Sequence, residues 1–536
     1  MPITKLQEKM IELIAAGTPL VLVRTDEPED VEHDLSTLCT GGDVDWDVNV
    51  WDCDDGLVTK DSAHQAGKAA ANTDPVAAML GGNKGKQSLA AAVKLLGKPR
   101  DADDEGDKDP VILIARNAHM FWRDGAGERS LLIQALANFY RVGKSEHVHV
   151  VMVGPPSATV PDEIKPLVTV VAHDLPSKED FAAVIDDIDL GDKKAPVDDL
   201  EAVCLASCGL TRGQAEAAYA ISLGRLSKID PRVVEEYKAE VLNADGMLTQ
   251  YKGAETFDDI GGNDALKEFL VKAMDPETRK RAKKPIRAVA LVGPPGTGKT
   301  LAAKALGNHA RLKTYAVDVG KTKSKWVGES EAGVRGMYAK LDAMAPIVAY
   351  YDEVNEQLGA GGGDDHSVDR HIVQATLVWL NDHTSDVFVV MTANNIADMH
   401  MALLRAGRVN AVFYVGLPGK KQKQAIWNLA IERYGLDVPD GAKLPDDTGW
   451  AGAEITECCA MADALACPLL EAARYIIPSS TRNAEKINSL KEWADGRVID
   501  AETGLVYSKN KEEALAATGE LIPLGQRRKR KVRAVK

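Results

Sequence analysis

The chain has 536 residues, of which 65 are lysine or arginine and 80 are aspartate or glutamate, so its formal net charge at pH 7 is −15. This length predicts about three or four compact units, and the acidic balance excludes a protein that coats nucleic acid over its whole surface. The sequence has no long apolar run and no signal-peptide core at its start, so we expect a soluble, cytoplasmic protein without membrane contact. Its seven cysteines are odd in number and scattered, which favours reduced thiols.

The first block, residues 1–245, alternates short apolar strands with helical stretches, as parallel α/β sheets do. We predict helices over 178–242 and strands over 19–23, 48–51, 111–114, 148–153 and 168–172.

The loops of this block lack nucleotide chemistry. The first strand is followed by Arg24–Glu29, which has no glycine loop and three acidic groups that would repel phosphate. The third strand is followed by Ala115-Arg116-Asn117, where a metal-binding acid pair would be expected. We therefore predict a degenerate, non-catalytic copy of the second block; an unrelated α/β domain with the same rhythm is the alternative.

Residues 243–256 join this block to a second one, predicted over 246–420. It repeats the alternation, with strands expected over 288–292, 314–318, 347–351, 387–392 and 411–415. That pattern predicts a parallel, doubly wound sheet that binds ligands at the carboxyl ends of its strands. The helical periodicity that follows predicts a lid over 421–500, and residues 501–536 form a tail with a basic end.

A glycine-rich loop lies between the strand 288–292 and a helical run that begins at Leu301. Its sequence, Gly293-Pro294-Pro295-Gly296-Thr297-Gly298-Lys299-Thr300, has the spacing G-x-x-x-x-G-K-[ST]. The glycines let backbone N–H groups surround phosphates, Lys299 reaches the β- and γ-phosphates, and Thr300 ligates Mg²⁺. The loop therefore predicts a site for a nucleoside triphosphate and Mg²⁺.

Polar side chains follow the next strands of this block. Asp352 and Glu353 end a buried strand, where Asp352 is suited to hold Mg²⁺ and Glu353 to orient or deprotonate the attacking water. Asn394 follows the next strand and can hold that water or sense the γ-phosphate. Arg405 and Arg408 suit stabilisation of transition-state charge on a neighbour's nucleotide. The alternatives are a surface acid pair, a turn asparagine and two surface salt bridges.

Taken in order, these segments resemble the AAA-type ATPases over about residues 255–475. The matching segments are Phe257–Gly262, Gly293–Thr300, Lys325–Glu331, Asp352–Glu353, Asn394, Arg405–Arg408 and Gly452–Glu454. A narrower likeness, to the cyanobacterial and plastid open-reading-frame (Ycf-type) AAA proteins, rests on Val387–Ile396, Ile477–Pro478 and Ile487–Ala494. The resemblance implies a P-loop AAA+ module, with a parallel five-stranded sheet and a helical lid, preceded by a degenerate AAA-like α/β domain.

The resemblance also implies roles for single residues. Asn394 would be the sensor residue, and Arg405 and Arg408 would be fingers inserted into the site of an adjacent protomer. The adenine and ribose would lie between Asp259–Gly261 and Gly452–Ala453. The residues expected to contact ATP are Asp259, Ile260, Gly261, Pro295, Gly296, Thr297, Gly298, Lys299, Thr300, Leu301, Gly452 and Ala453. Such ATPases are usually ring hexamers, so we expect a homo-oligomer.

Trp326-Val327-Gly328 decides between the functional hypotheses, because an aromatic residue on such a loop could grip an extended polypeptide. A tryptophan packed against its own subunit is the alternative. Our first hypothesis is an ATP-hydrolysing ring motor that remodels a protein partner, which the first block recruits directly or through an adaptor. The second is an ATP-dependent switch or scaffold without threading. A nucleic-acid-associated ATPase ranks last, because it depends only on the basic run 527–533.

Overall fold

The computed structural model describes residues 4–40, 47–53, 56–59, 88–96, 111–123, 125, 127–188, 195–324, 327–358, 366–395, 401–405, 407–439 and 443–510. The chain divides into two compact units, Met1–Lys238 and Ala239–Lys536. Each unit has its own sheet and its own buried core.

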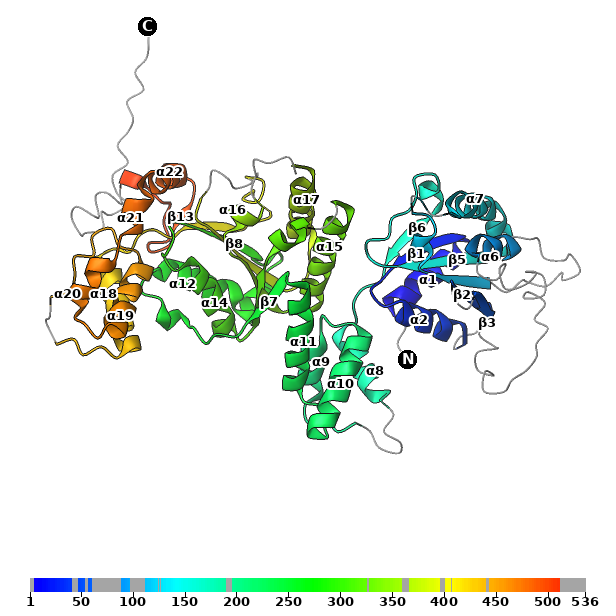
Figure 1. Ribbon diagram of the computed structural model, residues 1–536, viewed down its shortest axis with the longest axis horizontal. Coiled ribbons are helices and arrows are strands. Elements are labelled where there is room, and N and C mark those ends of the chain that lie inside the picture. Colours follow the sequence, from blue (N-terminus) through cyan, green and yellow to red (C-terminus); the bar gives the residue numbers. More distant parts are fainter. Residues whose placement is uncertain are drawn as a thin grey trace, which may run out of the picture. The chain divides into compact units, whose positions relative to one another are not determined.

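The first unit contains a six-stranded sheet in the order β3-β2-β4-β5-β1-β6 (Figure 1). All neighbouring strands are parallel except β2 and β3. The strands are β1 (Leu20–Arg24), β2 (Asp47–Asp52), β3 (Gly56–Thr59), β4 (Val111–Arg116), β5 (Val148–Gly154) and β6 (Thr169–Ala172).

Alternate residues of these strands point to opposite faces of the sheet. Leu20 and Leu22 belong to a buried cluster with α6 and α7, whereas Val21 and Val23 belong to a second cluster with α1 and α2. The layer helices are α1 (Lys5–Ala15), α2 (Pro28–Thr40), α6 (Leu89–Leu96) and α7 (Arg129–Glu146), with short 3-10 turns η1 (Ala118–Met120) and η2 (Lys165–Leu167). A group of helices follows the sheet: α8 (Lys178–Asp186), α9 (Leu200–Ser207), α10 (Arg212–Leu226) and α11 (Pro231–Asp245).

The second unit contains a seven-stranded sheet in the order β13-β12-β8-β11-β10-β9-β7. Its five predicted strands are parallel neighbours, β13 adds a parallel edge, and β7 adds an antiparallel one. The strands are β7 (Leu248–Tyr251), β8 (Ala288–Val292), β9 (Lys313–Val317), β10 (Ile347–Tyr351), β11 (Val387–Ala393), β12 (Ala411–Tyr414) and β13 (Ile499–Asp500).

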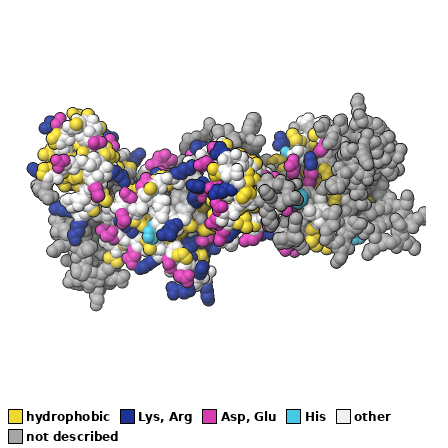
Figure 2. Space-filling model, turned by 90° about the horizontal axis from the view of Figure 1, so that it is seen from below, with side chains coloured by type: hydrophobic (Ala, Val, Ile, Leu, Met, Phe, Trp, Pro, Cys, Tyr) yellow, Lys and Arg dark blue, Asp and Glu magenta, His cyan; other side chains and the backbone are white. Residues whose placement is uncertain are grey.

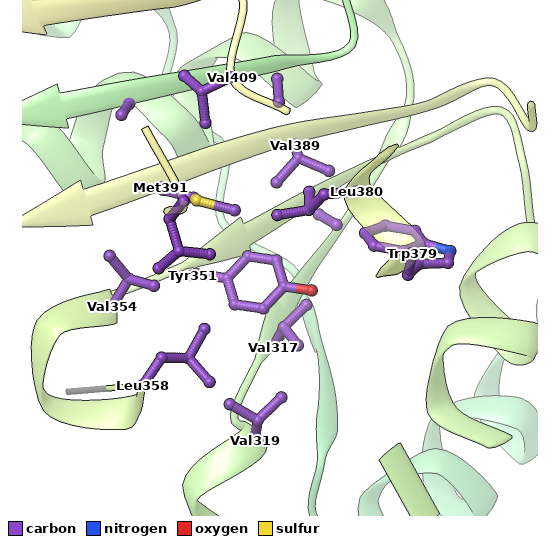
Figure 3. Packing of buried hydrophobic residues seen from close by; sticks show 14 of the residues in the cluster. Val317, Val319, Tyr351, Val354, Leu358, Trp379, Leu380, Val389, Met391 and Val409 are labelled. Atoms are coloured by element: carbon purple, nitrogen blue, oxygen red, sulfur yellow. The ribbon is translucent and has the colours of Figure 1, made fainter. Parts of the chain in front are cut away.

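Two layers of helices cover this sheet. In Figure 1, α12 and α14 lie on one side and α16 and α17 on the other. The first layer packs on Val289 and Leu291, and the second packs on Ala288, Ala290 and Val292. Figure 3 shows the core between the sheet and the second layer, in which Tyr351, Met391 and Leu380 lie close together. The elements are η3 (Phe257–Asp259), α12 (Asp264–Met274), α13 (Pro276–Arg281), α14 (Lys299–Ala310), η4 (Val319–Ser324), α15 (Val327–Ala343), α16 (Val354–Gln357) and α17 (His366–Asp382).

The lid helices have a separate core, in which Trp427, Trp450 and Ile455 are buried. They are α18 (Lys420–Tyr434), α19 (Gly452–Ala464), α20 (Leu469–Ala472), η5 (Ala473–Tyr475) and α21 (Ser479–Arg482). The chain then returns to the sheet. Leu490 and Ala494 of α22 (Ala484–Ala494) join the core of the large sheet, and β13 pairs with β12. The last part of the range predicted as lid, 421–500, thus packs with the sheet.

The predicted fold class is confirmed: the second unit contains the five predicted parallel strands, within a sheet of seven, and a helical lid, and an α/β unit precedes it. Every predicted strand occurs within about two residues of its expected bounds. The segment 243–256, predicted as a linker, contains β7 and is therefore part of the second sheet. Among the described residues, no helix is long and apolar enough to cross a membrane. Basic and acidic side chains are interspersed on the face drawn in Figure 2.

Candidate nucleotide site

The glycine-rich loop connects β8 to the N-terminus of α14. Gly293 allows a close approach, because a Cβ atom there would lie 2.0 Å from the carbonyl oxygen of Val415. Gly298 has a φ of 90°, a conformation that favours glycine, and a Cβ atom there would meet nothing within 4 Å. The loop therefore turns tightly against β12 and leaves open space beside the start of α14, where backbone N–H groups favour anions.

Lys299 is buried in this loop, with 5% of its surface exposed. Its Nζ donates to the carbonyl oxygens of Gly293, at 2.8 Å, and Pro294, at 2.6 Å. Burial lowers the pKa of Lys299 to about 8, although the negative charges of Asp352 and Glu353 oppose that shift. A buried cation that donates to two carbonyl oxygens of the loop is well placed to bind phosphate.

The predicted acid pair lies at the end of β10, and the structure brings it next to Thr300 and Asn394. The hydroxyl of Thr300 donates to Asp352 Oδ1 at 2.7 Å, and Asn394 Nδ2 donates to Glu353 Oε1 at 2.5 Å. Burial, followed by the nearby carboxylates of Glu356 and Asp352, raises the pKa of Glu353, whereas Lys299 opposes the rise. Hydroxyl and carboxylate oxygens are the donors that Mg²⁺ prefers, so Thr300 and Asp352 suit that ion.

The two segments predicted to bracket the adenine also come together. A Cβ atom on Gly261 would lie 2.5 Å from Ile426 Cγ1, and one on Gly452 would lie 3.4 Å from Ile426 Cδ1. The backbone N–H of Ala453 donates to the carbonyl oxygen of Gly296 at 3.0 Å. Ile426 of the lid helix α18 therefore lies between the two segments and near both of them. Helix α19 begins directly over the glycine-rich loop.

The remaining predicted residues of the first segment are also placed. Asp259 accepts from the backbone N–H of Thr256 at 2.7 Å and lies 3.3 Å from Arg433 on α18. Those hydrogen bonds, that of Thr256 first, lower the pKa of Asp259. Ile260 is buried in the core of the sheet.

The structure describes only part of the predicted arginine fingers and of the segment Trp326–Gly328. Arg405 is exposed, and Arg408 Nη1 donates to the carbonyl oxygen of Ala402 at 2.8 Å. Trp326 lies outside the described residues, and of Val327 and Gly328 only the backbone is described. The roles of Arg405, Arg408 and the Trp326 loop remain predictions from the sequence.

Several residues beside the acid pair were not predicted from the sequence. Asn355 Oδ1 accepts from the backbone N–H of Asn394 at 3.4 Å. Gln357 Nε2 donates to the carbonyl oxygen of Asp352 at 2.8 Å. Thr392 contacts both acidic residues through its hydroxyl. No motif marks these residues, although their nearness in sequence to Asp352 or Asn394 could have signalled them.

The first unit has an equivalent loop, between β1 and α2, and acidic side chains of this region are paired with the start of α10. The backbone N–H of Gly213, at the start of α10, donates to Glu27 Oε1 at 3.1 Å. Arg212 lies 3.5 Å from Asp30. Burial is the main reason that the pKa of Glu27 rises to about 7; hydrogen bonds from the Gly213 region oppose it and Asp30 adds to it.

The end of β4, where the second unit has its acid pair, carries a cation in the first unit. Arg116 Nη2 donates to Glu32 Oε2 at 2.6 Å, and its Nε donates to the other oxygen of the same carboxylate. This bidentate pair is the geometry that makes arginine–carboxylate contacts strong. An ion pair thus lies where the second unit has its acid pair, and the non-catalytic role of the first unit stays a prediction from the sequence.

Comparison with known protein families finds two matches. Residues 289–417 match the ATPase family associated with various cellular activities (AAA). Residues 6–173 match the N-terminal domain of SpoVK-like AAA ATPases.

Individual relatives match over longer spans. The AAA domain-containing protein ycf46 of Guillardia theta is 26% identical over 413 residues, which are 73% of this chain and 80% of that protein. Its counterpart from Trieres chinensis is 23% identical over 84% of this chain and 87% of its own length. The cell division cycle protein 48 homolog of Archaeoglobus fulgidus is 34% identical, but over 49% of this chain and 35% of its own length.

The lowered pKa of Lys299 leads to a prediction for ATP binding. Bound phosphates would stabilise the protonated amine, so above pH 8 binding must take up a proton, because the pKa in the nucleotide-free protein is about 8. Affinity should then fall by up to about tenfold per pH unit above that value. Calorimetry at pH 9 in buffers of different ionisation enthalpy measures the uptake. A Lys304→Met variant, changed farther along α14, should keep it; absence of uptake in the wild type would refute the assignment.

The raised pKa of Glu27 leads to a prediction for the first unit. The folded unit binds this proton more tightly than the unfolded chain, whose pKa is 4.5, so stability is lost as pH rises from about 4.5 to about 7. Glu27→Gln should therefore slow hydrogen exchange in α10 at least several-fold at pH 8 and change it little at pH 4, below both pKa values. Glu29→Gln, an exposed neighbour on α2, is the matched control. Faster exchange in Glu27→Gln at pH 8 would contradict the prediction.

Proposed function

We propose that this ATPase is a ring-forming motor that uses ATP hydrolysis to remodel a protein partner, a proposal supported by the match of residues 289–417 to the AAA family. The observation that carries the chemistry is the contact of Thr300, Asp352, Glu353 and Asn394 at the mouth of the glycine-rich loop. Thr300 lies on α14, which follows β8 and the glycine-rich loop, whereas the other three residues directly follow the neighbouring strands β10 and β11. Among them, Asp352 would hold the metal ion and Glu353 would orient the attacking water.

In the proposed site the glycine-rich loop and Lys299 bind the phosphates of ATP, and Thr300 and Asp352 hold Mg²⁺. The ion would supply charge neutralisation on the phosphate oxygens. Glu353 orients the attacking water and accepts its proton, which its raised pKa favours. Asn394 fixes the Glu353 carboxylate from the neighbouring strand. The negative charges of Asp352 and Glu353 act on Lys299, where they raise its pKa against the effect of burial.

The adenine and ribose would lie between the segment Asp259–Gly261 and the start of α19. Gly261 and Gly452 both lie against Ile426, so a larger side chain at Gly261 would collide with the lid. Since Ile426 belongs to the lid and Gly261 to the large part, a base bound beside them would contact both. The position of the lid relative to the large part would thereby depend on whether a nucleotide is bound.

We further propose a ring, most simply a hexamer, in which Arg405 and Arg408 complete the site of the next subunit. Arg405 is exposed, and Arg408 donates to the backbone carbonyl oxygen of Ala402. An exposed arginine beside one that is held in place suits that role. Trp326 would grip the polypeptide, and the first unit would recruit the substrate or its adaptor. An ATP-dependent switch without threading is the other candidate, and nucleic acid would enter only through the basic run 527–533.

The shared site is tested with two variants. Glu353→Gln should bind ATP but hydrolyse it about 100- to 10,000-fold more slowly, and Arg405→Ala should bind ATP and lose about 1,000-fold or more of its turnover. Mixing the two should restore part of the phosphate release, because a normal acid and a normal arginine then meet at some interfaces. Glu268→Gln, at an exposed side chain of α12, is the control. Full activity in Glu353→Gln would disprove its role, and a mixture no faster than its parts would disprove sharing.

The motor is tested with Trp326→Ala. Proteins that co-purify with Glu353→Gln in the presence of ATP are identified by mass spectrometry, and their remodelling by wild type is then measured. Trp326→Ala should abolish remodelling and spare basal hydrolysis, whereas Trp326→Phe should keep both because it retains an aromatic ring. Unchanged remodelling in Trp326→Ala would favour the switch. A captured nucleic acid, lost on removal of residues 526–536, would favour the third hypothesis.

A further inference from the structure

Thr392 is the penultimate residue of β11 and is 1% exposed. Its hydroxyl donates to Asp352 Oδ1 at 2.6 Å and accepts from the backbone N–H of Glu353 at 2.9 Å. One buried hydroxyl therefore contacts both members of the acid pair. The hydroxyl of Thr300 donates to the same oxygen of Asp352 at 2.7 Å.

The contact with the backbone of Glu353 fixes an uncommon conformation. Glu353 has a φ of 51° and a ψ of 52°, which is left-handed backbone that residues with a Cβ atom rarely adopt. Such conformations persist where surrounding contacts hold them, and they cluster at functional sites. Thr392 provides one of these contacts. The resulting turn places the Glu353 carboxylate within reach of Asn394.

The contact with Asp352 fixes a side chain. Asp352 Oδ1 accepts from both threonine hydroxyls, which defines the orientation of the carboxylate. Asp352 directly follows β10, the strand next to β11, in whose register Tyr351 pairs with Met391.

The strand register makes position 392 specific. Met391 and Ala393 join the core on one face of the sheet, whereas Phe388 and Val390 join the core on the other face, together with α14. Because side chains alternate along a strand, Thr392 points to the face of α14, which carries Thr300. A threonine at position 391 or 393 would point away from that helix.

We propose that Thr392 is a positioning residue of the hydrolytic site, which holds the carboxylate of Asp352 and the backbone of Glu353 in one fixed relation. The inference rests on the roles proposed above for those two acids. With the hydroxyl present, the group that holds Mg²⁺ and the group that activates water keep a constant separation. Without it, both the metal requirement and the rate of hydrolysis should change, while the glycine-rich loop and Lys299 still bind the nucleotide.

The test uses full-length Thr392→Val, which keeps the β-branched shape and removes the hydroxyl. We expect kcat to fall about ten- to a hundredfold, the scale of losing a hydrogen bond to a charged group, with KM for ATP nearly unchanged. The Mg²⁺ concentration that gives half-maximal phosphate release should rise, which a merely structural residue would not cause. Thr392→Ser, which keeps the hydroxyl, should restore both values. Thr392→Ala should repeat the losses of Thr392→Val and serves if the valine variant does not fold.

Thr376→Val is the matched control, because Thr376 is also buried in this unit and its hydroxyl contacts Tyr338, not the acid pair. It should keep the kcat and the Mg²⁺ requirement of the wild type. Wild-type kcat and Mg²⁺ dependence in Thr392→Val would overturn the inference, and so would equal losses in Thr392→Ser. If Glu353→Gln were fully active, the proposed function itself would fail; if Glu353→Gln is inactive and Thr392→Val is normal, only the role of Thr392 fails.

Discussion

In each unit, the N-terminus of one helix is fixed over the loop that follows the first parallel strand. The donor is the second residue of the helix in both cases: Ala453 in α19 and Gly213 in α10. The N–H groups of a first helical turn have no partner within the helix, and they carry the positive end of its dipole. In the second unit a backbone carbonyl, that of Gly296, accepts the bond, so the loop needs no acid and remains compatible with phosphate. In the first unit Glu27 accepts it and takes the place that an anion would need.

The two units share a strand order and differ in where their charges lie. Counting only the five parallel strands predicted in each unit, in chain order, both sheets run fifth, first, fourth, third, second. At the end of the third strand, the first unit has Arg116, paired with Glu32, and the second has Asp352, bonded to Thr300. A closed ion pair satisfies both of its members, whereas hydroxyl and carboxylate oxygens side by side still attract a cation. The same framework thus supports a closed unit and a reactive one.

The elements that could be predicted from the sequence are those that form continuous apolar runs. The central parallel strands of the two sheets are buried on both faces and read as apolar runs. The loop and the acid pair have short, fixed spacings. The edge strands β7 and β13, of four and two residues, form only because a neighbouring strand offers hydrogen-bond partners. Thr392 and Ile426 were missed for a similar reason: each is an ordinary residue inside a strand or helix, and only tertiary register brings it to the site.

The acid pair is also connected to the segment that precedes the proposed gripping loop. Gln357 donates to the carbonyl oxygen of Asp352 at 2.8 Å, and its other amide atom accepts from the backbone N–H of Val319 at 3.2 Å. Val319 is buried and begins η4, which ends directly before residues 325–326. A side chain that bonds two backbones resists their separation, since either break leaves a polar group without its partner. In the proposed motor, a displacement of Asp352 during hydrolysis would therefore reach the base of the Trp326 loop through one amide, without rearrangement of the sheet.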